Sequence, residues 1–396
     1  MTNLIAGMGT STSANTASAV GEAVAQALKG MNGHAAQLAF VTCTVEHKAE
    51  EVHRAVREKL KDVPVHGITT SLGVLGTHGV ASGGHGAVGI LLFAGVDGVT
   101  VGAGHARIDG DGRAAGRKAA EMLLARTGGA RPAVVLFNAS PGLEEDVLAG
   151  VAEVLPDVPV HGGSAADNAI AGEWSVFTSE GPISNGVSLA GICGPVRKGA
   201  SFLAPFTVTE KKLKVTSTAG RTIESLDGRP AGVVLGELLG DAIRFQVAEG
   251  GNVLAQTSLH PLGLQKSDAH YLTLHPAHIH AGDKKLDVFA RVSAGDQLCL
   301  MQGSEDGLLE ALSLLVDSAL SDGGMKGSDV KAGVLIYCAG CAGTVGGKLG
   351  DALKQHLAPR LGGAPVLGLC TFGEQGNVRG VGNIHQNLTL GLLLLG

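Results

Sequence analysis

Aromatic and charged residues are both scarce in this chain, at 3% and 17% of its 396 residues. Few aromatic side chains, a net charge of −6 and the lack of a basic run argue against binding of nucleic acid through base stacking or phosphate contacts. No apolar run reaches the roughly 18–20 residues that a membrane-spanning helix needs. We therefore expect no nucleic-acid partner and no membrane insertion.

Cysteine is also sparse, and the few cysteines are spread over the whole chain. So low a density in a long chain does not indicate a disulfide scaffold. The first residues also lack the basic segment and long apolar core of a secretory signal. The sequence thus predicts a reduced, cytoplasmic protein. The cysteines are Cys43, Cys193, Cys299, Cys338, Cys341 and Cys370.

Glycine and apolar residues are abundant instead. The chain has 62 glycines without a collagen-like period, and 44% of its residues are hydrophobic. This composition favours sheets that are covered on both faces and disfavours disorder. The length predicts two or three domains with well-buried cores.

A hexapeptide, Asp-Val-Pro-Val-His-Gly, occurs twice, at Asp62–Gly67 and Asp157–Gly162, and a looser copy ends at Gly368. Each copy follows an apolar strand and an amphipathic helix, and a Gly-rich loop leads from it into another apolar strand. The pattern predicts three versions of one α/β unit, with a large insertion before the third.

The strand and helix that open each unit are expected to begin at Ile5, Val101 and Leu298. Asp97-Gly98 lies between two apolar runs, which is a strong signal for a β-hairpin. The sheets should therefore be mixed. We predict an α/β fold of mixed β-sheets packed with helices, built from repeated β-α-β-α-β-β units, in two domains.

The repeat also predicts where a ligand would bind. In open α/β sheets, ligands bind beyond the carboxyl ends of strands, where loops and helix N-termini converge. The alignment of the units gives two equivalent strand-end positions in each. They are Cys43, Asn138 and Cys338 after one strand, and Thr69, Ser164 and Cys370 after the other.

Polar residues cluster around these strand ends, and they form the candidate ligand-binding set. Donors and acceptors of both signs suit a zwitterion such as an amino acid, and no nucleophile and base are assembled as in a hydrolase. We therefore expect a binding protein rather than an enzyme. The candidate residues are Ser164, Asp167, Asn168, Cys338, Cys341, Thr371, Glu374 and Asn387.

Cys338 and Cys341 allow other interpretations. A C-x-x-C between a strand and a helix can be redox-active, because a helix N-terminus lowers the pKa of a thiol. Together with Cys370 and His385, the pair could also bind zinc. His278 and His280 share one face of a predicted strand and could hold a metal, although exposed histidines explain them as well. Catalysis, metal binding and a purely structural role all stay open.

With these residues in hand, the chain resembles the FIST sensory-domain family, as a stand-alone protein with FIST N-terminal and FIST C-terminal domains. The resemblance implies residues 1–206 for the first domain, with two copies of the repeat. Residues 207–396 would form the second, with the insertion and the third repeat. The matching motifs are Val160–Asp167, Val215-Thr216, Leu226–Ala231, Pro261–Gly263, Cys338, Gly368-x-x-Thr371-Phe372-Gly373-Glu374 and His385-x-Asn387-x-Thr389.

The resemblance implies sensing rather than catalysis. FIST domains are regarded as intracellular sensors of small ligands, amino acids among them, so the chain would signal through a protein partner. Some stand-alone relatives are haem proteins that sense nitric oxide and govern a histidine kinase. On that alternative, the candidate axial ligands are His66, His161, His385 and the run from His270 to His280.

The chain departs from the family pattern at one position near Cys338. Relatives usually carry an Arg shortly after this cysteine, whereas position 341 is Cys here. The change removes a side chain that could hold a carboxylate or phosphate in a bidentate manner. The identity of the ligand therefore does not follow from the resemblance.

Overall fold

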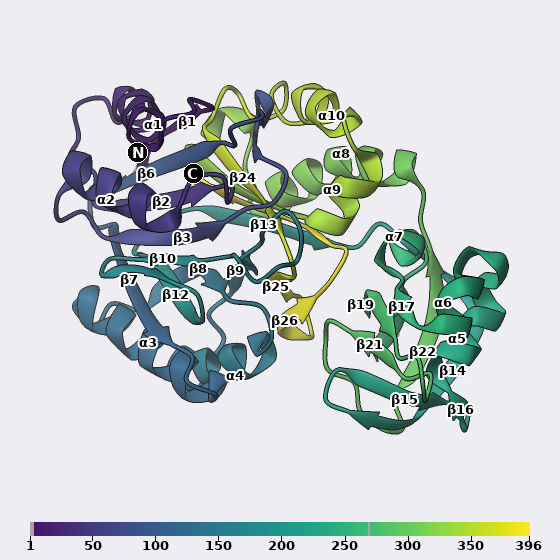
Figure 1. Ribbon diagram of the computed structural model, residues 1–396. Helices are drawn as coiled ribbons and strands as arrows, with labels where there is room; N and C mark the ends of the chain where they lie inside the picture. Colours follow the sequence, from purple (N-terminus) through teal and green to yellow (C-terminus); the bar gives the residue numbers. More distant parts are fainter. Residues whose placement is uncertain (1–3, 268–269) are drawn as a thin grey trace.

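The structure is a computed structural model that describes residues 4–267 and 270–396. A large body holds three six-stranded mixed sheets, and a smaller β-rich domain lies to one side of it (Figure 1). The predicted α/β fold with mixed sheets and two domains is confirmed. No helix among the described residues is long and apolar enough to cross a membrane.

The first sheet has the strand order β1-β6-β2-β3-β10-β11, in which only β2 and β3 are parallel. Helix α1 begins after Asn15, whose side chain accepts a hydrogen bond from the Ser18 amide at 2.9 Å. The first unit supplies β1 (Leu4–Ser11), α1 (Thr16–Gly30), β2 (Leu38–Cys43), α2 (Ala49–Leu60), β3 (Val65–Thr69) and β6 (Val88–Gly95).

The second sheet has the equivalent order β7-β12-β8-β9-β25-β26, and the third has β13-β27-β23-β24-β4-β5. The second unit supplies β7 (Thr100–Arg107), α3 (Gly112–Arg126), β8 (Pro132–Ala139), α4 (Glu144–Val154), β9 (Val160–Ser164) and β12 (Gly186–Cys193). The third supplies β13 (Lys198–Leu203), α8 (Glu305–Asp322), η2 (Gly327–Asp329), β23 (Ala332–Cys338), α9 (Ala339–Val345), α10 (Lys348–His356), β24 (Val366–Thr371) and β27 (Leu390–Leu395).

The Gly-rich stretch of each unit forms a short hairpin that joins the sheet of another unit. The hairpin of the first unit pairs with β24 of the third, that of the second with β3 of the first, and that of the third with β9 of the second. The exchange is therefore cyclic. The hairpins are β4 (Val74–Gly76) with β5 (Gly79–Ala81), β10 (Val176–Thr178) with β11 (Gly181–Ile183), and β25 (Glu374–Val378) with β26 (Gly382–Gln386).

The hairpin predicted at Asp97-Gly98 is wrong. Both residues adopt the positive φ angles that a tight turn requires, 48° and 89°. However, β6 pairs with β1 and β2, whereas β7 pairs with β12 in the second sheet. The turn thus links two sheets rather than two paired strands.

The predicted opening strand of the third unit is also wrong. The strand at Leu298 is β22 (Gln297–Gln302), which pairs with β14 and β18 of the inserted domain. The strand equivalent to β1 and β7 is β13, which pairs with β27. The insertion therefore interrupts the third unit between β13 and α8, and both of its ends lie at the same edge of the body.

The inner faces of the three sheets share one apolar core. It combines Phe40 and Ile68 of the first unit with Leu136 of the second and Val334 and Leu369 of the third. Helices α1 and α2, α3 and α4, and α8 to α10 cover the outer faces of the first, second and third sheets, respectively. The buried sheets explain the near-continuous apolar strands of the sequence.

The repeated Pro-Val-His-Gly segments form β3 and β9 in this core. His66 contacts Ser188 of the second sheet through Nδ1 at 2.9 Å, and the Nε2 atom of His161 lies 3.0 Å from the Val334 carbonyl oxygen of the third. Only glycine fits after His161, because a Cβ atom on Gly162 would lie 1.6 Å from the Phe137 carbonyl oxygen. The repeat thus serves the packing of sheets against one another.

The inserted domain has a core of its own around a nine-stranded sheet. Its strands are β14 (Thr207–Ala219), β15 (Thr222–Leu226), β16 (Arg229–Pro230), β17 (Gly251–Asn252), β18 (Leu262–Ser267), β19 (His270–Leu274), β20 (Pro276–Ile279), β21 (Leu286–Val288) and β22. Its helices are α5 (Ala231–Leu239), η1 (Gly240–Ile243), α6 (Arg244–Glu249) and α7 (Leu254–Thr257).

Candidate functional site

The carboxyl ends of β3, β9 and β24 meet at one place in the body. Backbone hydrogen bonds join each strand end to the next, so the three units close a ring. Because all three ends lie together, loops from every unit can contribute to one site. The bonds run from Ala166 N to Thr69 O (3.0 Å), from Ser164 N to Gly373 O (2.8 Å) and from Ser71 N to Cys370 O (3.1 Å).

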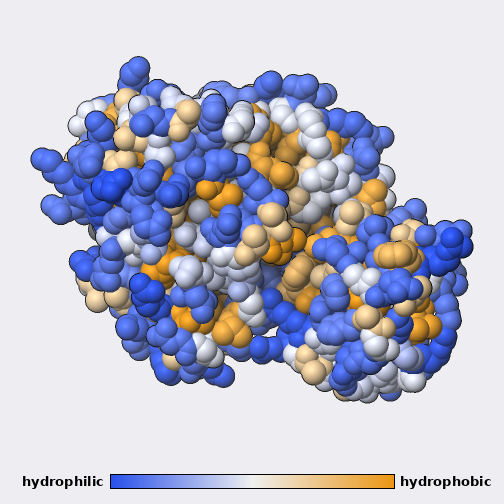
Figure 2. All heavy atoms as spheres, viewed as in Figure 1, coloured by the Kyte–Doolittle hydropathy of each residue, from blue (hydrophilic) through white to orange (hydrophobic). Residues whose placement is uncertain are grey.

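A pocket of about 870 Å³ lies beside this ring, between the body and the inserted domain. The start of α9 and the loops after β3, β9 and β24 form one wall, and α7, His275 and Phe289 of the inserted domain form the other. Figure 2 shows apolar side chains gathered where the two parts meet. The volume suits a small organic molecule.

Aromatic side chains line the pocket although they are rare in the chain. Trp174, the single tryptophan, packs edge-to-face against Phe372 with ring centroids 6.0 Å apart, and Phe289 approaches from the inserted domain. Leu72 and Ile170 also face the pocket and are 47% and 49% exposed. Such a surface would bury the apolar part of a ligand.

Cys338 lies on the wall of the pocket at the end of β23, and α9 begins directly after it. Cys341, in the first turn of α9, is fully buried. The Cys341 side chain lowers the pKa of Cys338 to about 7; burial opposes this change, and the backbone amides of Cys341, Gly340 and Leu388 favour it. Burial raises the pKa of Cys341. Cys338 is therefore the acidic thiol of the pair.

Glu374 and Thr371 lie next to Cys338. Glu374 is completely buried and accepts hydrogen bonds from the Thr371 hydroxyl at 2.8 Å and the Thr389 amide at 3.1 Å. Burial raises the pKa of Glu374 well above its usual range, and the negative charge of Cys338 raises it further. The carboxyl group is thus held in its neutral form.

Asp167 and Asn168 hold loops in place. The carboxylate of Asp167 accepts hydrogen bonds from the amides of Ala169 and Ala171 at 2.9 Å, and also from Ile170 and Glu173, so it fixes the loop that carries Trp174. Asn168 accepts from the Leu72 amide at 3.0 Å and donates to Glu46 at 2.7 Å. Both residues shape the wall of the pocket.

Asn387 joins the body to the inserted domain. Its backbone N–H donates to the Thr273 carbonyl oxygen at 3.0 Å, and its side-chain oxygen accepts from the backbone N–H of His275 at 3.4 Å. Within the described residues, its buried Nδ2 atom has no hydrogen-bond partner. A buried donor without a partner costs about 1–3 kcal/mol. An acceptor on a ligand in the pocket would relieve that cost.

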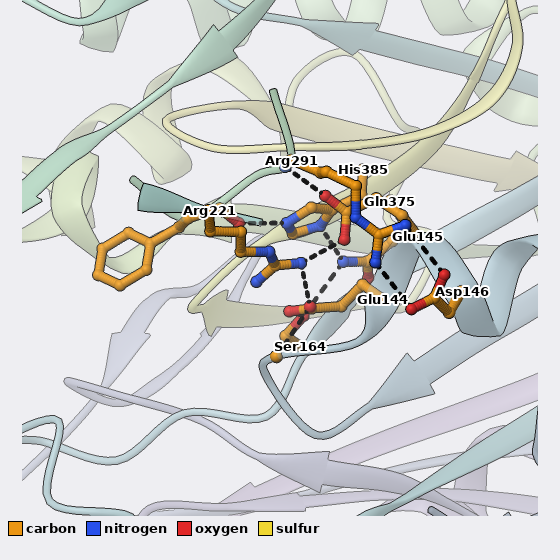
Figure 3. A network of polar contacts seen from close by, with 10 residues as sticks. Glu144, Glu145, Asp146, Ser164, Arg221, Arg291, Gln375 and His385 are labelled. Carbon is orange, nitrogen blue, oxygen red and sulfur yellow. Dashed lines mark hydrogen bonds and ion pairs between the residues drawn. The ribbon is translucent and has the colours of Figure 1, made fainter. Parts of the chain in front are cut away.

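A buried polar network lies at one end of the pocket (Figure 3). Ser164 donates to Glu144 at 2.8 Å, and the Nη2 atom of Arg221 donates to Glu144 at 2.6 Å and to Glu145. Burial alone would raise the pKa of Glu144, but His385 and Arg221 outweigh it and lower the pKa. Glu144 is therefore ionised, and it anchors the inserted domain to the start of α4.

The network continues on the far side of Glu145. Arg291 of the inserted domain pairs with Asp146 in a bidentate manner, at 2.8 and 3.0 Å, and its backbone amide donates to Glu145 at 2.7 Å. The two ring nitrogens of His385 contact Gln375 at 2.8 Å and the Phe289 carbonyl at 2.9 Å. We call the contacts of Arg221 and Arg291 with α4 the inter-domain ion pairs.

The structure brings most of the sequence-predicted residues to one place. The pocket is lined by Asp167, Asn168, Cys338, Thr371 and Asn387. Ser164 belongs to the polar network, and Cys341 and Glu374 are completely buried.

Several residues of the site escaped the sequence analysis, among them Glu144, Trp174 and Arg221. Acidic residues are common in the first turn of helices, because the helix dipole stabilises negative charge there. The position of Glu144 in the sequence therefore did not indicate a functional role. Arg221 lies in the turn between β14 and β15, 77 residues from Glu144 in sequence. No local pattern could connect the two. The sequence could have indicated Trp174, because it is the single tryptophan of the chain and lies in a loop of small residues.

The proposed zinc ligands are not gathered into a site. Within residues 4–267 and 270–396, no three of Cys338, Cys341, Cys370 and His385 have their donor atoms within 4.8 Å of one another. His278 and His280 do lie close to Asp287, and the Nε2 atom of His280 is 3.0 Å from both carboxylate oxygens. That cluster lies on the surface of the inserted domain, away from the pocket.

Most of the candidate haem ligands lie in the core or contact protein groups through their ring nitrogens. His66 and His161 lie within the central core, and both ring nitrogens of His385 are engaged. His275 lines the pocket, but its Nε2 atom lies 3.0 Å from the Leu254 carbonyl oxygen, and burial lowers its pKa to about 4. Since an axial ligand needs a ring nitrogen directed at the iron, we derive no step through haem.

Comparison with protein families matches two models to nearly the whole chain. The FIST N domain matches residues 37–229, and the FIST C domain matches residues 233–377. The chain belongs to the FIST family, whose domains are associated with sensory signal transduction. No curated protein matches the sequence.

Proposed function

We propose that this protein senses a small amino-acid-like molecule that binds in the pocket between the body and the inserted domain. The observation that carries the proposal is the position of the pocket: its walls come from both FIST domains, so a bound ligand would contact both at once. Ligand pockets often lie at such domain interfaces. Binding would change the balance between open and closed arrangements of the two parts.

The lining supports a ligand with a polar head and an apolar body. Arg221 lies on the pocket, and only its Nη2 atom is used in the inter-domain ion pairs that the structure describes. Its remaining N–H groups suit a carboxylate, as does the unpaired amide nitrogen of Asn387. Glu305, at another part of the lining, pairs with Lys348 through Oε2, and its Oε1 atom suits an ammonium group. The aromatic residues would hold an apolar side chain.

The chemistry of the polar residues supports binding rather than catalysis. Ser164 donates to Glu144 and accepts from Gln375 at 3.1 Å, and no histidine hydrogen-bonds to its hydroxyl oxygen among the contacts described. Asp167 is fully used by backbone amides. A sensor of this kind would pass its signal to a protein partner, through the surface where the inserted domain meets the body.

Trp174 provides a direct test. We expect L-amino acids with apolar side chains to change the Trp174 fluorescence and to release or absorb heat in calorimetry, and glycine and lysine to do so more weakly. Arg221→Gln should weaken binding at least tenfold, which corresponds to about 1.4 kcal/mol. Arg291→Gln is the matched control, because Arg291 also pairs with α4 but does not line the pocket. An unchanged signal across the whole panel would contradict the proposal.

A further inference from the structure

The six cysteines differ in their surroundings, and none of them forms a disulfide. Cys338 alone among them lines the pocket. Burial raises the pKa of the other five, whereas the pKa of Cys338 is lowered to about 7. At pH 7 the thiolate share of Cys338 is then about fiftyfold larger than for an ordinary thiol, whose pKa is 9.0.

Cys341 is placed to react with Cys338 and with nothing from outside. Cys338 directly precedes α9, and Cys341 is the third residue of that helix. A hydrogen bond joins their side chains. Cys341 is fully buried, while Cys338 is reached through the pocket. One sulfur is thus accessible and ionised, and the other is protected and protonated.

We propose that Cys338 is a reaction site for small hydroperoxides and that Cys341 resolves the product into a disulfide. The proposal shares the pocket with the ligand-binding function but does not depend on it. The pocket, at about 870 Å³, admits a hydroperoxide to the sulfur. The neutral Glu374 carboxyl lies beside the thiolate and can donate a hydrogen bond to it, as a partner for its charge.

The reaction balances without a cofactor. The Cys338 thiolate attacks the terminal oxygen of the hydroperoxide; an S–O bond forms, the O–O bond breaks, and the leaving alkoxide takes a proton from water. The Cys338 sulfur is now a sulfenic acid. The Cys341 sulfur then attacks it: an S–S bond forms, the S–O bond breaks, and hydroxide leaves with the Cys341 proton as water. A dithiol reductant restores both thiols.

The test uses the full-length, fully reduced protein and hydrogen peroxide. After a titration at pH 7, the remaining thiols are alkylated and the peptides are analysed by mass spectrometry. We expect a Cys338–Cys341 disulfide as the first product, with Cys43, Cys193, Cys299 and Cys370 still alkylated. The proposal is overturned if another cysteine is oxidised first, or if both thiols persist at peroxide concentrations that oxidise free N-acetylcysteine.

Three variants separate the roles of the two thiols. Cys341→Ser should accumulate a sulfenic acid at Cys338, which dimedone traps, and Cys338→Ser should form no disulfide. Cys370→Ser is the matched control, because Cys370 is buried on the neighbouring strand and does not line the pocket. Circular dichroism checks that each variant is folded; if Cys338→Ser is not, dimedone trapping in Cys341→Ser decides alone. The fluorescence of Trp174 with amino acids is a separate readout, so the two proposals can fail independently.

Discussion

Cys43 and Cys338 are the last residues of β2 and β23, yet their thiols differ in acidity. Each lies in parallel register with a threonine at the end of the next strand, Thr69 or Thr371. Burial, and then the charge of Glu46, raises the pKa of Cys43, whereas the pKa of Cys338 falls to about 7. Position in the fold therefore does not decide the chemistry of the side chain.

The difference comes from where the following helix begins. After Cys43, several residues precede α2, and the Cys43 thiol donates to the His47 carbonyl at 3.6 Å. After Cys338, α9 begins at once and brings the amides and the Cys341 thiol close to the sulfur. The inserted domain adds a second difference, because it builds the pocket over the third unit. Each difference can be tested separately.

The largest expected effect concerns thiol reactivity in the native protein. At pH 7, iodoacetamide should label Cys338 at least about a hundredfold faster than Cys43, because only Cys338 is both ionised and accessible. Its rate should rise between about pH 6 and pH 8, with a midpoint near 7. Peptide mass spectrometry over time gives both rates, and denatured protein is the control. Equal native rates would show that the two strand ends do not differ as described.

The second effect concerns the domain that covers Cys338. Arg221→Ala should lower the free energy of unfolding by about 3 kcal/mol, because it leaves the buried charge of Glu144 without its partner. Arg291→Ala should cost less than about 1 kcal/mol, since the Arg291–Asp146 pair is partly exposed. Urea unfolding measures both. Similar losses would mean that the two inter-domain ion pairs contribute equally.

The third effect uses a natural difference among the units. His66 and His161 lie in the core where the third unit has Leu367, and burial lowers the pKa of His161 to about 4. Below pH 6.5 this histidine binds a proton in the unfolded chain but stays neutral in the folded chain. The free energy of unfolding therefore decreases as the pH is lowered from about 6.5 to 4. The slope is at most about 1.4 kcal/mol per pH unit for each such histidine. His161→Leu should remove its share of that slope in urea unfolding at several pH values; an unchanged slope would contradict the assignment.

The smallest effect concerns exposed apolar residues of the first unit. Leu72→Ala and Leu28→Ala should each change the free energy of unfolding by less than about 0.5 kcal/mol, since both side chains are nearly half exposed. However, only Leu72 lines the pocket. Calorimetry with an apolar amino acid should therefore find weaker binding for Leu72→Ala alone. Equal binding by the two variants would place the ligand elsewhere.

Much of the fold follows from local pattern in the sequence. The apolar strands and amphipathic helices lie where the hydrophobic periodicity predicts them. The reason is that the burial of apolar side chains determines both the periodicity of the sequence and the element that forms. The exchange of hairpins could not be predicted, since glycine-rich segments carry no register and β4, β10 and β25 each pair with strands of another unit. The error at Leu298 has the same origin: an apolar strand does not show which sheet it will join.

The candidate site was predicted in part for a related reason. Residues at strand ends, such as Cys338 and Ser164, follow from the repeat, because equivalent strand ends lie at equivalent edges. Arg221 and Phe289 come from the insertion, which the repeat does not describe. Their approach depends on how two separately folded parts pack, and that packing rests on contacts between residues far apart in the chain.

The cyclic exchange of hairpins restricts how this architecture can change in evolution. Each sheet is completed by a neighbour, and the last unit is completed by the first. Loss of one unit would leave one hairpin without a sheet and another sheet with an open edge. A fourth unit could be added only if one of the existing hairpin–sheet pairings were broken. The closed exchange therefore disfavours any other copy number. The inserted domain lies inside a unit, between β13 and α8, where it leaves this exchange intact.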